Sequence, residues 1–327
     1  MRAAEIFELS SDFSGLRIVD RDPPHPGPGE LRVAVRAAAL NFPDILMAQG
    51  LYQLKPDLPF TPGLEGAGEI VELGEGVEGW TVGDRVMLGS RFGMIAEQLV
   101  LPASVVRAMP PGFSFAEAAG FTTIALTAYV ALVRRANLLA GETLVVHGAA
   151  GGVGSAAIML GKHLGATVIA TASSPEKRAF ATRIGADHAL DSASEFRMPV
   201  KELTGGRGAD VIFDPVGGDV FDQSVRAIGF DGRLLVIGFA GGRIPELPVN
   251  KALIKGFSVM GVRAGEYGRQ FPDKGRENMA ALDELAAQGV MKPVIGKSFP
   301  LDQLHDAYRE LSERRALGKV VITMGRD

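Results

Sequence analysis

Residues 143–165 read TLVVHGAAGGVGSAAIMLGKHLG, and this stretch is the clearest indication of the fold. It opens with an apolar run at 143–148 that is typical of a buried strand, and it closes with a helical pattern over 155–165. Between them, HGAAGGVG at 147–154 forms a glycine-rich turn. Such a turn lets a pyrophosphate approach the backbone beside the free N–H groups of a helix N-terminus. The stretch therefore predicts a dinucleotide-binding turn, the alternative being a tight turn without a ligand.

Downstream of this turn, strands alternate with helical segments. Further strands are predicted at 167–172, 211–218, 233–242 and 257–264, and a further helix at 175–185. This alternation is typical of a doubly wound parallel sheet with helices on both faces. The fold class is therefore α/β, with a Rossmann nucleotide-binding domain.

The region upstream of the turn has a different texture. Three strand-like runs at 31–40, 66–74 and 81–90 are separated by glycine and proline signals. This spacing predicts a compact β-rich domain. The pattern changes at the alanine-rich, helical segment that begins near residue 113.

The C-terminal tail returns to the strand pattern. GKVVITM, residues 318–324, is a strand that is too short to form a core alone, so it should pack back onto the first domain. We therefore expect a β-rich domain over 1–122 and 266–327, with the nucleotide-binding domain inserted over 123–265.

Composition excludes several classes of protein. The 327 residues include no cysteine, which excludes disulfides, iron–sulfur clusters, thiolate zinc sites and cysteine nucleophiles. A formal net charge of −4 lacks the basic excess typical of nucleic-acid binding. Residues 1–15 carry charges throughout and have no apolar core segment, so we do not expect them to be a signal peptide, and no apolar run reaches the roughly 20 residues that cross a bilayer. We expect a cytoplasmic protein with no nucleic-acid or membrane partner.

The residues after the second predicted strand indicate which dinucleotide is bound. Sites that prefer NAD place an aspartate or glutamate there, to hold the ribose hydroxyls. This chain has Ser173 and Ser174 at that place, followed by Lys177 and Arg178. Two hydroxyls and two cations can receive a 2′-phosphate, so we predict NADPH as the cofactor. The alternative is that the two cations are solvated residues of a helical first turn.

Seven stretches carry a resemblance to a known family. They run in the order LNFPDILMAQGLY (40–52), LPFTPGLEGAGEIVELGEGV (58–77), VGDRV (82–86), LTAYVAL (126–132), HGAAGGVG (147–154), DPVGGDVF (214–221) and GFAGG (238–242). Together they resemble the medium-chain dehydrogenase/reductase superfamily, in its zinc-free quinone oxidoreductase (zeta-crystallin-like) branch. The resemblance implies a GroES-like β-rich catalytic domain beside the Rossmann domain.

The resemblance also implies a site without zinc. In the zinc-dependent relatives a cysteine ligand stands at the position of Asn41 and a histidine at that of Leu64, and a separate lobe carries four cysteines. This chain retains only Glu65 of that pattern, and the resemblance implies a structural role for it at the domain junction. We expect no metal.

The resemblance implies direct hydride transfer from NADPH to a quinone or an α,β-unsaturated carbonyl compound. Without a metal, hydrogen-bond donors must stabilise negative charge on the substrate oxygen. Family positions at the nicotinamide and substrate cleft match Asn41, Asp44 and Tyr52, our catalytic candidates. The alternatives are a turn-capping amide for Asn41, a helix N-terminal carboxylate for Asp44 and a loop anchor for Tyr52. Some bacterial quinone reductases of this branch carry a second tyrosine where this chain has Leu46.

Other cofactor contacts are expected in the glycine-rich turn, at the ends of later strands and at two family positions. They are Ala150, Gly151, Gly152, Val153, Gly154, Val216, Gly217, Gly238, Phe239, Ala240, Thr127 and Lys319. His147 precedes the turn, and we expect it to be a hydrogen-bonded core residue rather than an acid.

Two other functions remain open. An enoyl-thioester reductase shares the fold and the cofactor, and a low-turnover NADPH-binding protein of the crystallin kind uses the fold without much catalysis. The strand at 257–264 is expected at the edge of its sheet, where relatives pair across a two-fold axis, so we expect a homodimer.

Overall fold

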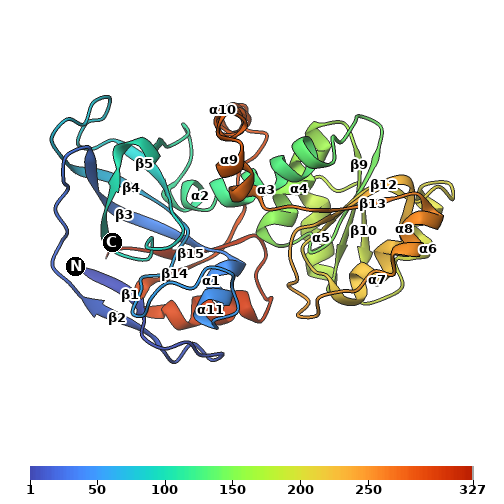
Figure 1. The fold of residues 1–327 in the computed structure, drawn as a ribbon, viewed down its shortest axis with the longest axis horizontal. Helices are drawn as coiled ribbons and strands as arrows, with labels where there is room; N and C mark the ends of the chain where they lie inside the picture. The colour runs from blue at the N-terminus through green and yellow to red at the C-terminus, as the bar shows by residue number, and fades with distance from the viewer. Residues whose placement is uncertain (326–327) are drawn as a thin grey trace. The chain divides into compact units, whose positions relative to one another are not determined.

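The computed structural model describes residues 1–325 and divides into two compact units (Figure 1). The first unit comprises Met1–Thr123 and Pro293–Asp327, and the second comprises Ile124–Lys292. Each unit has its own sheet and its own core. No helix among the described residues has the length and apolarity that a membrane span requires.

The second unit is built on a six-stranded parallel sheet. Its strand order is β10 (His188–Asp191), β9 (Thr167–Ala172), β8 (Thr143–Val146), β11 (Ala209–Asp214), β12 (Ile228–Val236) and β13 (Ser258–Gly261). The order reverses between β8 and β11, and ligands bind at the carboxyl ends of strands beside such a reversal. The predicted parallel sheet is thus confirmed.

Helices precede, connect and follow these strands. They are α3 (Thr122–Tyr129), the π-helix η2 (Val130–Arg135), α4 (Gly152–His163), α5 (Pro175–Arg183), α6 (Arg197–Leu203), α7 (Gly218–Ala227), α8 (Val249–Lys255), α9 (Ala264–Gln270) and α10 (Pro272–Ala287). The central strands are buried on both faces, and Val145, Ile169, Ile212 and Leu234 have no exposed surface. Their continuous apolar runs reflect that double burial.

The C-terminal limit of the second unit lies beyond the residue that the sequence pattern indicated. Helices α9 and α10 follow residue 266 and belong to the second unit. Arg134 of η2 donates from Nε to Asn278 Oδ1 at 2.8 Å and from Nη2 to Glu277 Oε2 at 2.7 Å. These bonds hold α10 on the second unit, and the chain returns to the first unit at Pro293.

The first unit contains a mostly antiparallel sheet. Its strand order is β14 (Ile295–Pro300), β15 (Lys319–Thr323), β3 (Glu30–Leu40), β4 (Glu65–Leu73), β5 (Arg85–Gly89) and β7 (Arg107–Ala108). Strand β6 (Gln98–Pro102) also pairs with β3. Strands β1 (Arg2–Ile6) and β2 (Leu16–Asp20) form a separate two-stranded sheet. Strand β15 pairs antiparallel with β3, so that Val320 lies opposite Leu40. The C-terminal strand is thus part of the sheet of the first unit.

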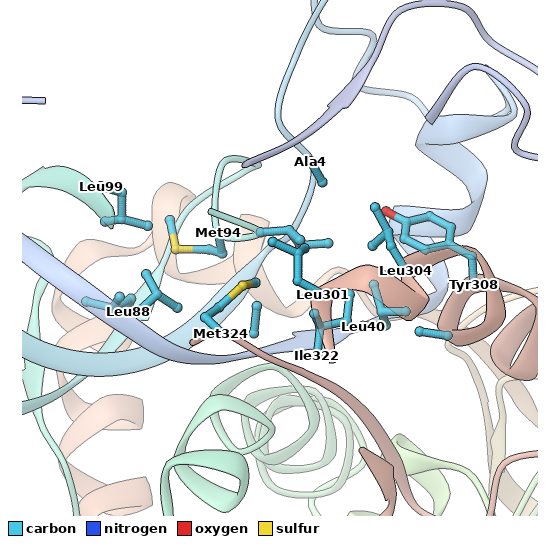
Figure 2. Close-up of a cluster of buried hydrophobic side chains, with 14 of the residues drawn as sticks. Ala4, Leu40, Leu88, Met94, Leu99, Leu301, Leu304, Tyr308, Ile322 and Met324 are labelled. Carbon is cyan, nitrogen blue, oxygen red and sulfur yellow. The ribbon is translucent and has the colours of Figure 1, made fainter. Parts of the chain in front are cut away.

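Helices α1 (Phe42–Ala48), α2 (Phe115–Ala119) and α11 (Leu304–Ser312), and the short 3-10 helices η1 (Ala103–Val105) and η3 (Leu301–Gln303), complete the first unit. In Figure 2, Leu304 and Tyr308 of α11 lie in one buried cluster with Leu40 of β3 and Ile322 of β15. This core fixes the end of β3, from which α1 and the candidate residues 41–52 follow.

Candidate functional site

The glycine-rich turn of the second unit is closely packed. It joins the end of β8 to α4, whose N-cap is Gly151. A Cβ at Gly154 would lie 2.4 Å from the carbonyl oxygen of Gly148, so no larger residue fits there. Gly148 has a φ of +58°, and a Cβ there would lie 3.3 Å from Pro215 Cγ. Because Gly151 has no side chain, the cap leaves the first N–H groups of α4 open to an anion.

Two further turns lie at the carboxyl ends of neighbouring strands. The turn after β11 is held by Asp214, whose Oδ1 accepts from the N–H of Val216 at 2.8 Å and of Gly217 at 2.9 Å. The turn after β12 is bonded to it, because Ala240 N–H donates to Pro215 O at 3.0 Å. The structure thus brings five predicted residues together: Val216, Gly217, Gly238, Phe239 and Ala240.

Asp214 is a functional candidate that the sequence reasoning missed. It is buried, with 2% of its surface exposed, and both of its turn contacts are to backbone N–H groups. An aspartate that bonds the backbone two and three residues ahead is typical of a turn that needs fixing. The run Asp-Pro-Val-Gly-Gly after a strand carried that signal.

His147 follows the last residue of β8 and links β9 to α7. Its Nδ1 lies 2.7 Å from Thr171 Oγ1 and its Nε2 lies 2.7 Å from Ser224 Oγ. Since the Ser224 hydroxyl donates to Val220 O, its oxygen accepts from Nε2–H, and Nδ1 accepts from the Thr171 hydroxyl. Burial lowers the pKa of His147 to about 4, so the ring is neutral near neutral pH. It is a hydrogen-bonded core residue, as expected.

The end of β9 carries the residues predicted to select the dinucleotide. Ser173 is exposed, and Ser174 caps α5 by accepting from the N–H of Lys177 at 3.2 Å. Arg178 donates from Nη1 to Ala172 O at 3.3 Å, which brings its guanidinium to the last carbonyl of β9. The same nitrogen lies 3.3 Å from Asp191 Oδ2.

In the first unit a buried ammonium lies beside the end of β3. Lys319 is 3% exposed, and its Nζ donates to Leu40 O at 2.9 Å, Asn41 Oδ1 at 2.8 Å and Glu65 Oε1 at 2.9 Å. An ammonium has three N–H donors. These three acceptors therefore use every hydrogen that Lys319 can donate.

Asn41 is part of the same cluster. Its Nδ2 donates to Glu65 Oε1 at 3.0 Å and to Ala39 O at 3.3 Å, so both amide hydrogens are engaged. Glu65 Oε2 accepts from the backbone N–H of Thr123 at 2.8 Å. The cluster ties together β3, β4, β15 and the first turn of α3, which gives Glu65 a structural role within the first unit.

Asp44 lies at the first turn of α1 and is fully buried. Its Oδ2 accepts from the N–H of Asn41 at 2.8 Å and its Oδ1 from the N–H of Gly63 at 3.1 Å. Burial raises the pKa of Asp44 to about 7, while the two N–H groups and Lys319 act in the opposite direction. The geometry is that of a helix N-terminal carboxylate.

Tyr52 and Thr127 are the remaining candidates. Tyr52 follows α1, is partly buried and packs against the core of the first unit. Among the described residues the Tyr52 hydroxyl has no hydrogen-bond partner. The backbone N–H of Tyr52 donates to Leu46 O at 3.2 Å. Thr127 is a partly buried residue of α3 in the second unit.

The residues at the family's zinc position do not make a zinc site. Zinc is bound by thiolates, imidazoles and carboxylates. Here the position holds the amide of Asn41 and the side chain of Leu64, and Glu65 is already paired with the Lys319 ammonium. Within residues 1–325, no three histidine, cysteine, aspartate or glutamate side chains form a group that could hold a metal ion.

Comparisons with known proteins identify the family. The model of the alcohol dehydrogenase GroES-like domain matches residues 27–111, and that of the zinc-binding dehydrogenases matches residues 152–284. The chain is 38% identical over 325 residues to quinone oxidoreductase-like protein 2 of Mus musculus, with 99% of this chain and 92% of that protein covered. These matches confirm the predicted fold class.

Two solved structures are similar over their whole length. A mycobacterial protein complexed with NADPH has a TM-score of 0.89 and 31% identity, covering 99% of this chain and 100% of that one. The CurK enoyl reductase has a TM-score of 0.88 and 29% identity, covering 99% of both chains. The chain belongs to the medium-chain dehydrogenase/reductase family of oxidoreductases, in the branch of the quinone oxidoreductase-like proteins.

Proposed function

We propose that this oxidoreductase uses NADPH to reduce quinones or α,β-unsaturated carbonyl compounds, without a metal. The observation that carries the proposal is the set of three turns at the carboxyl ends of β8, β11 and β12, next to serines and cations at the end of β9. Two comparisons support it: a structural neighbour is complexed with NADPH, and the mouse relative is named quinone oxidoreductase-like.

The proposed cofactor contacts follow the three turns. The pyrophosphate would lie against residues 150–154, and the 2′-phosphate against Ser173, Ser174, Lys177 and Arg178. Thr127 and the turns at 216–217 and 238–240 would line the nicotinamide end. Lys319, expected as a cofactor contact, would act by fixing Asn41 within the first unit, because its three hydrogens are already bonded there.

The proposed chemistry needs little beyond positioning. When bound, NADPH supplies a hydride, and with one proton a quinone becomes a hydroquinone. The Tyr52 hydroxyl would donate a hydrogen bond to the substrate oxygen, where negative charge develops. Asn41 and Asp44 would hold the start of α1, and thereby the segment that carries Tyr52, through their bonds to Glu65, Lys319 and Gly63.

An enoyl-thioester reductase is the second candidate. The observation that favours it is the similarity to the CurK enoyl reductase over the whole chain. Both activities add hydride to a carbon conjugated with a carbonyl group. They differ in the substrate's tail, because a thioester of coenzyme A requires room for pantetheine and cations for its phosphates.

The test is NADPH consumption, followed by absorbance, with phenanthrenequinone, a small enone and crotonyl-CoA in parallel. The proposal expects turnover with the quinone or the enone to exceed turnover with crotonyl-CoA. The reverse order would favour the enoyl reductase. Tight NADPH binding with no turnover on any substrate would contradict both and favour a low-turnover binding protein.

We also propose that two copies of the chain pair through the β13 edge in the cytoplasm. Strand β13 ends the six-stranded sheet, so its outer edge has no neighbour among the described residues. Beside it, large apolar side chains are exposed: Phe230 by 83%, Val249 by 82%, Leu253 by 83% and Ile254 by 76%. An open edge flanked by apolar side chains is typical of a surface that a second copy covers.

A further inference from the structure

We propose that Asp191 is a specificity-determining residue, which weakens the preference for a 2′-phosphorylated dinucleotide by pairing with Arg178. The inference rests on the proposed function, because it concerns the cofactor site at the end of β9. No carboxylate follows β9 directly in the sequence. One reaches the site from the neighbouring strand.

The register of the sheet brings Asp191 to this site. Asp191 is the last residue of β10 and lies opposite Ala172, the last residue of β9. Its Oδ2 is 3.3 Å from Nη1 of Arg178, and that nitrogen also donates to Ala172 O at 3.3 Å. Its Oδ1 accepts from the N–H of Ala193 at 2.9 Å. Both carboxylate oxygens are therefore engaged, and the charge has a fixed place.

The charge of Asp191 acts on a bound phosphate in two ways, and both weaken phosphate binding. Pairing neutralises one of the two cations that would receive the phosphate. The carboxylate also repels the phosphate directly, since the two groups would lie beside the same strand end. The Arg178 and Asp191 side chains are 24% and 37% exposed, so solvent screens the pair and a phosphate can compete for Arg178.

Asp191 also has an opposite effect on phosphate binding, through the orientation of Arg178. The ion pair with Asp191 orients the Arg178 guanidinium, which would favour phosphate binding if the guanidinium already pointed to the phosphate. Nη1, however, also bonds to Ala172 O, so the backbone holds the arginine without Asp191. Removing the carboxylate charge therefore removes the neutralisation and the repulsion while keeping that anchor. The net effect of Asp191 is to lower selectivity for the phosphorylated dinucleotide.

The test compares the dissociation constants of NADPH and NADH for the full chain and its variants. D191N removes the charge and keeps an oxygen that accepts from Ala193. We expect it to tighten NADPH binding about two- to fivefold, the range of an exposed charge pair, with NADH unchanged. R178M alone should weaken NADPH binding and leave NADH binding unchanged, because it leaves the Asp191 carboxylate unpaired beside the phosphate, and in the D191N background it should cancel the gain. E202Q, on the exposed side of α6, is the control for lost charge.

Three outcomes would overturn the inference, and one of them would also overturn the proposed function. If D191N binds NADPH more weakly, Asp191 positions Arg178 for the phosphate and the inference is overturned. An unchanged ratio in D191N, with NADPH bound tightly by the wild type, also overturns it and leaves the proposed function standing. If the wild type binds neither dinucleotide, the proposed function itself fails, and this inference fails with it.

Discussion

Lys319 Nζ lies 2.9 Å from Glu65 Oε1, and the two side chains are 3% and 2% exposed. The pair joins the last strand of the chain to β4 across 254 positions of sequence. Burying two charges is costly unless each remaining hydrogen and lone pair is bonded. Here Leu40, Asn41 and Thr123 supply those bonds, so the ion pair is an internal part of the first unit rather than a surface contact.

We expect K319M to lower the free energy of unfolding by about 3 to 5 kcal/mol, because it leaves the Glu65 carboxylate buried and unpaired. The measurement is chemical denaturation followed by circular dichroism. The double variant K319M/E65Q should lose less than the sum of the single variants, since it leaves no lone charge. K297M is the control, because Lys297 is 55% exposed and its pair with Glu310 contributes little. Equal losses in K319M and K297M would contradict the prediction.

The buried carboxylate of Asp44 should make stability depend on pH. Its pKa rises from 3.8 to about 7 in the folded chain, so between about pH 4 and about pH 7 the folded state binds a proton that the unfolded state lacks. The Asp44 contribution to the free energy of unfolding is therefore largest at low pH, falls as pH rises through this window, and levels off above it. The difference between wild type and D44N should shrink by up to about 1.4 kcal/mol per pH unit. Parallel pH profiles of the two proteins would refute this assignment.

The Tyr52 hydroxyl is the proposed donor to the substrate oxygen. We expect Y52F to lower kcat for quinone reduction about 10- to 100-fold, because the lost hydrogen bond stabilises charge that develops in the transition state. The dissociation constant of NADPH should stay within about twofold. Y267F, on α9 in the second unit, is the matched control and should retain activity. A Y52F enzyme with unchanged kcat would remove Tyr52 from the mechanism.

The cations after β9 should discriminate between dinucleotides. K177A is expected to weaken NADPH binding about tenfold and to leave NADH binding unchanged, because only NADPH carries the 2′-phosphate. Titration of each dinucleotide by fluorescence measures both constants. K201A, a cation on α6, should leave both affinities unchanged. Equal losses for NADPH and NADH in K177A would show that Lys177 does not read the phosphate.

The exposed apolar face beside β13 should control assembly. We expect L253E to shift the chain from dimer to monomer, because it places a charge in a surface that pairing would bury. Light scattering coupled to size-exclusion chromatography gives the mass directly. L203E changes a half-exposed leucine on α6 and should leave the dimer intact. A wild type that is monomeric at all concentrations would end the dimer proposal.

The helices, strands and turns follow from residues that are close together in the chain. The turn at 147–154 is set by residues that are neighbours in the chain, because Gly148 and Gly154 pack against each other within one turn. Apolar runs likewise predicted the buried strands, since burial on both faces of a parallel sheet requires them. The return of strand β15 to the first unit followed from its length, because a strand of that size cannot form its own core.

The packing of distant elements sets which side chains meet. Asp191 lies opposite Ala172 because β10 pairs with β9, and that register cannot be read from either strand alone. Lys319 resembles a family position that faces the cofactor, yet its three hydrogens go to the end of β3 and to β4. Hydrogen bonds act over about 3 Å, whereas the residues they join are separated by long stretches of chain. Local patterns fix the elements, and the packing of those elements fixes the partners.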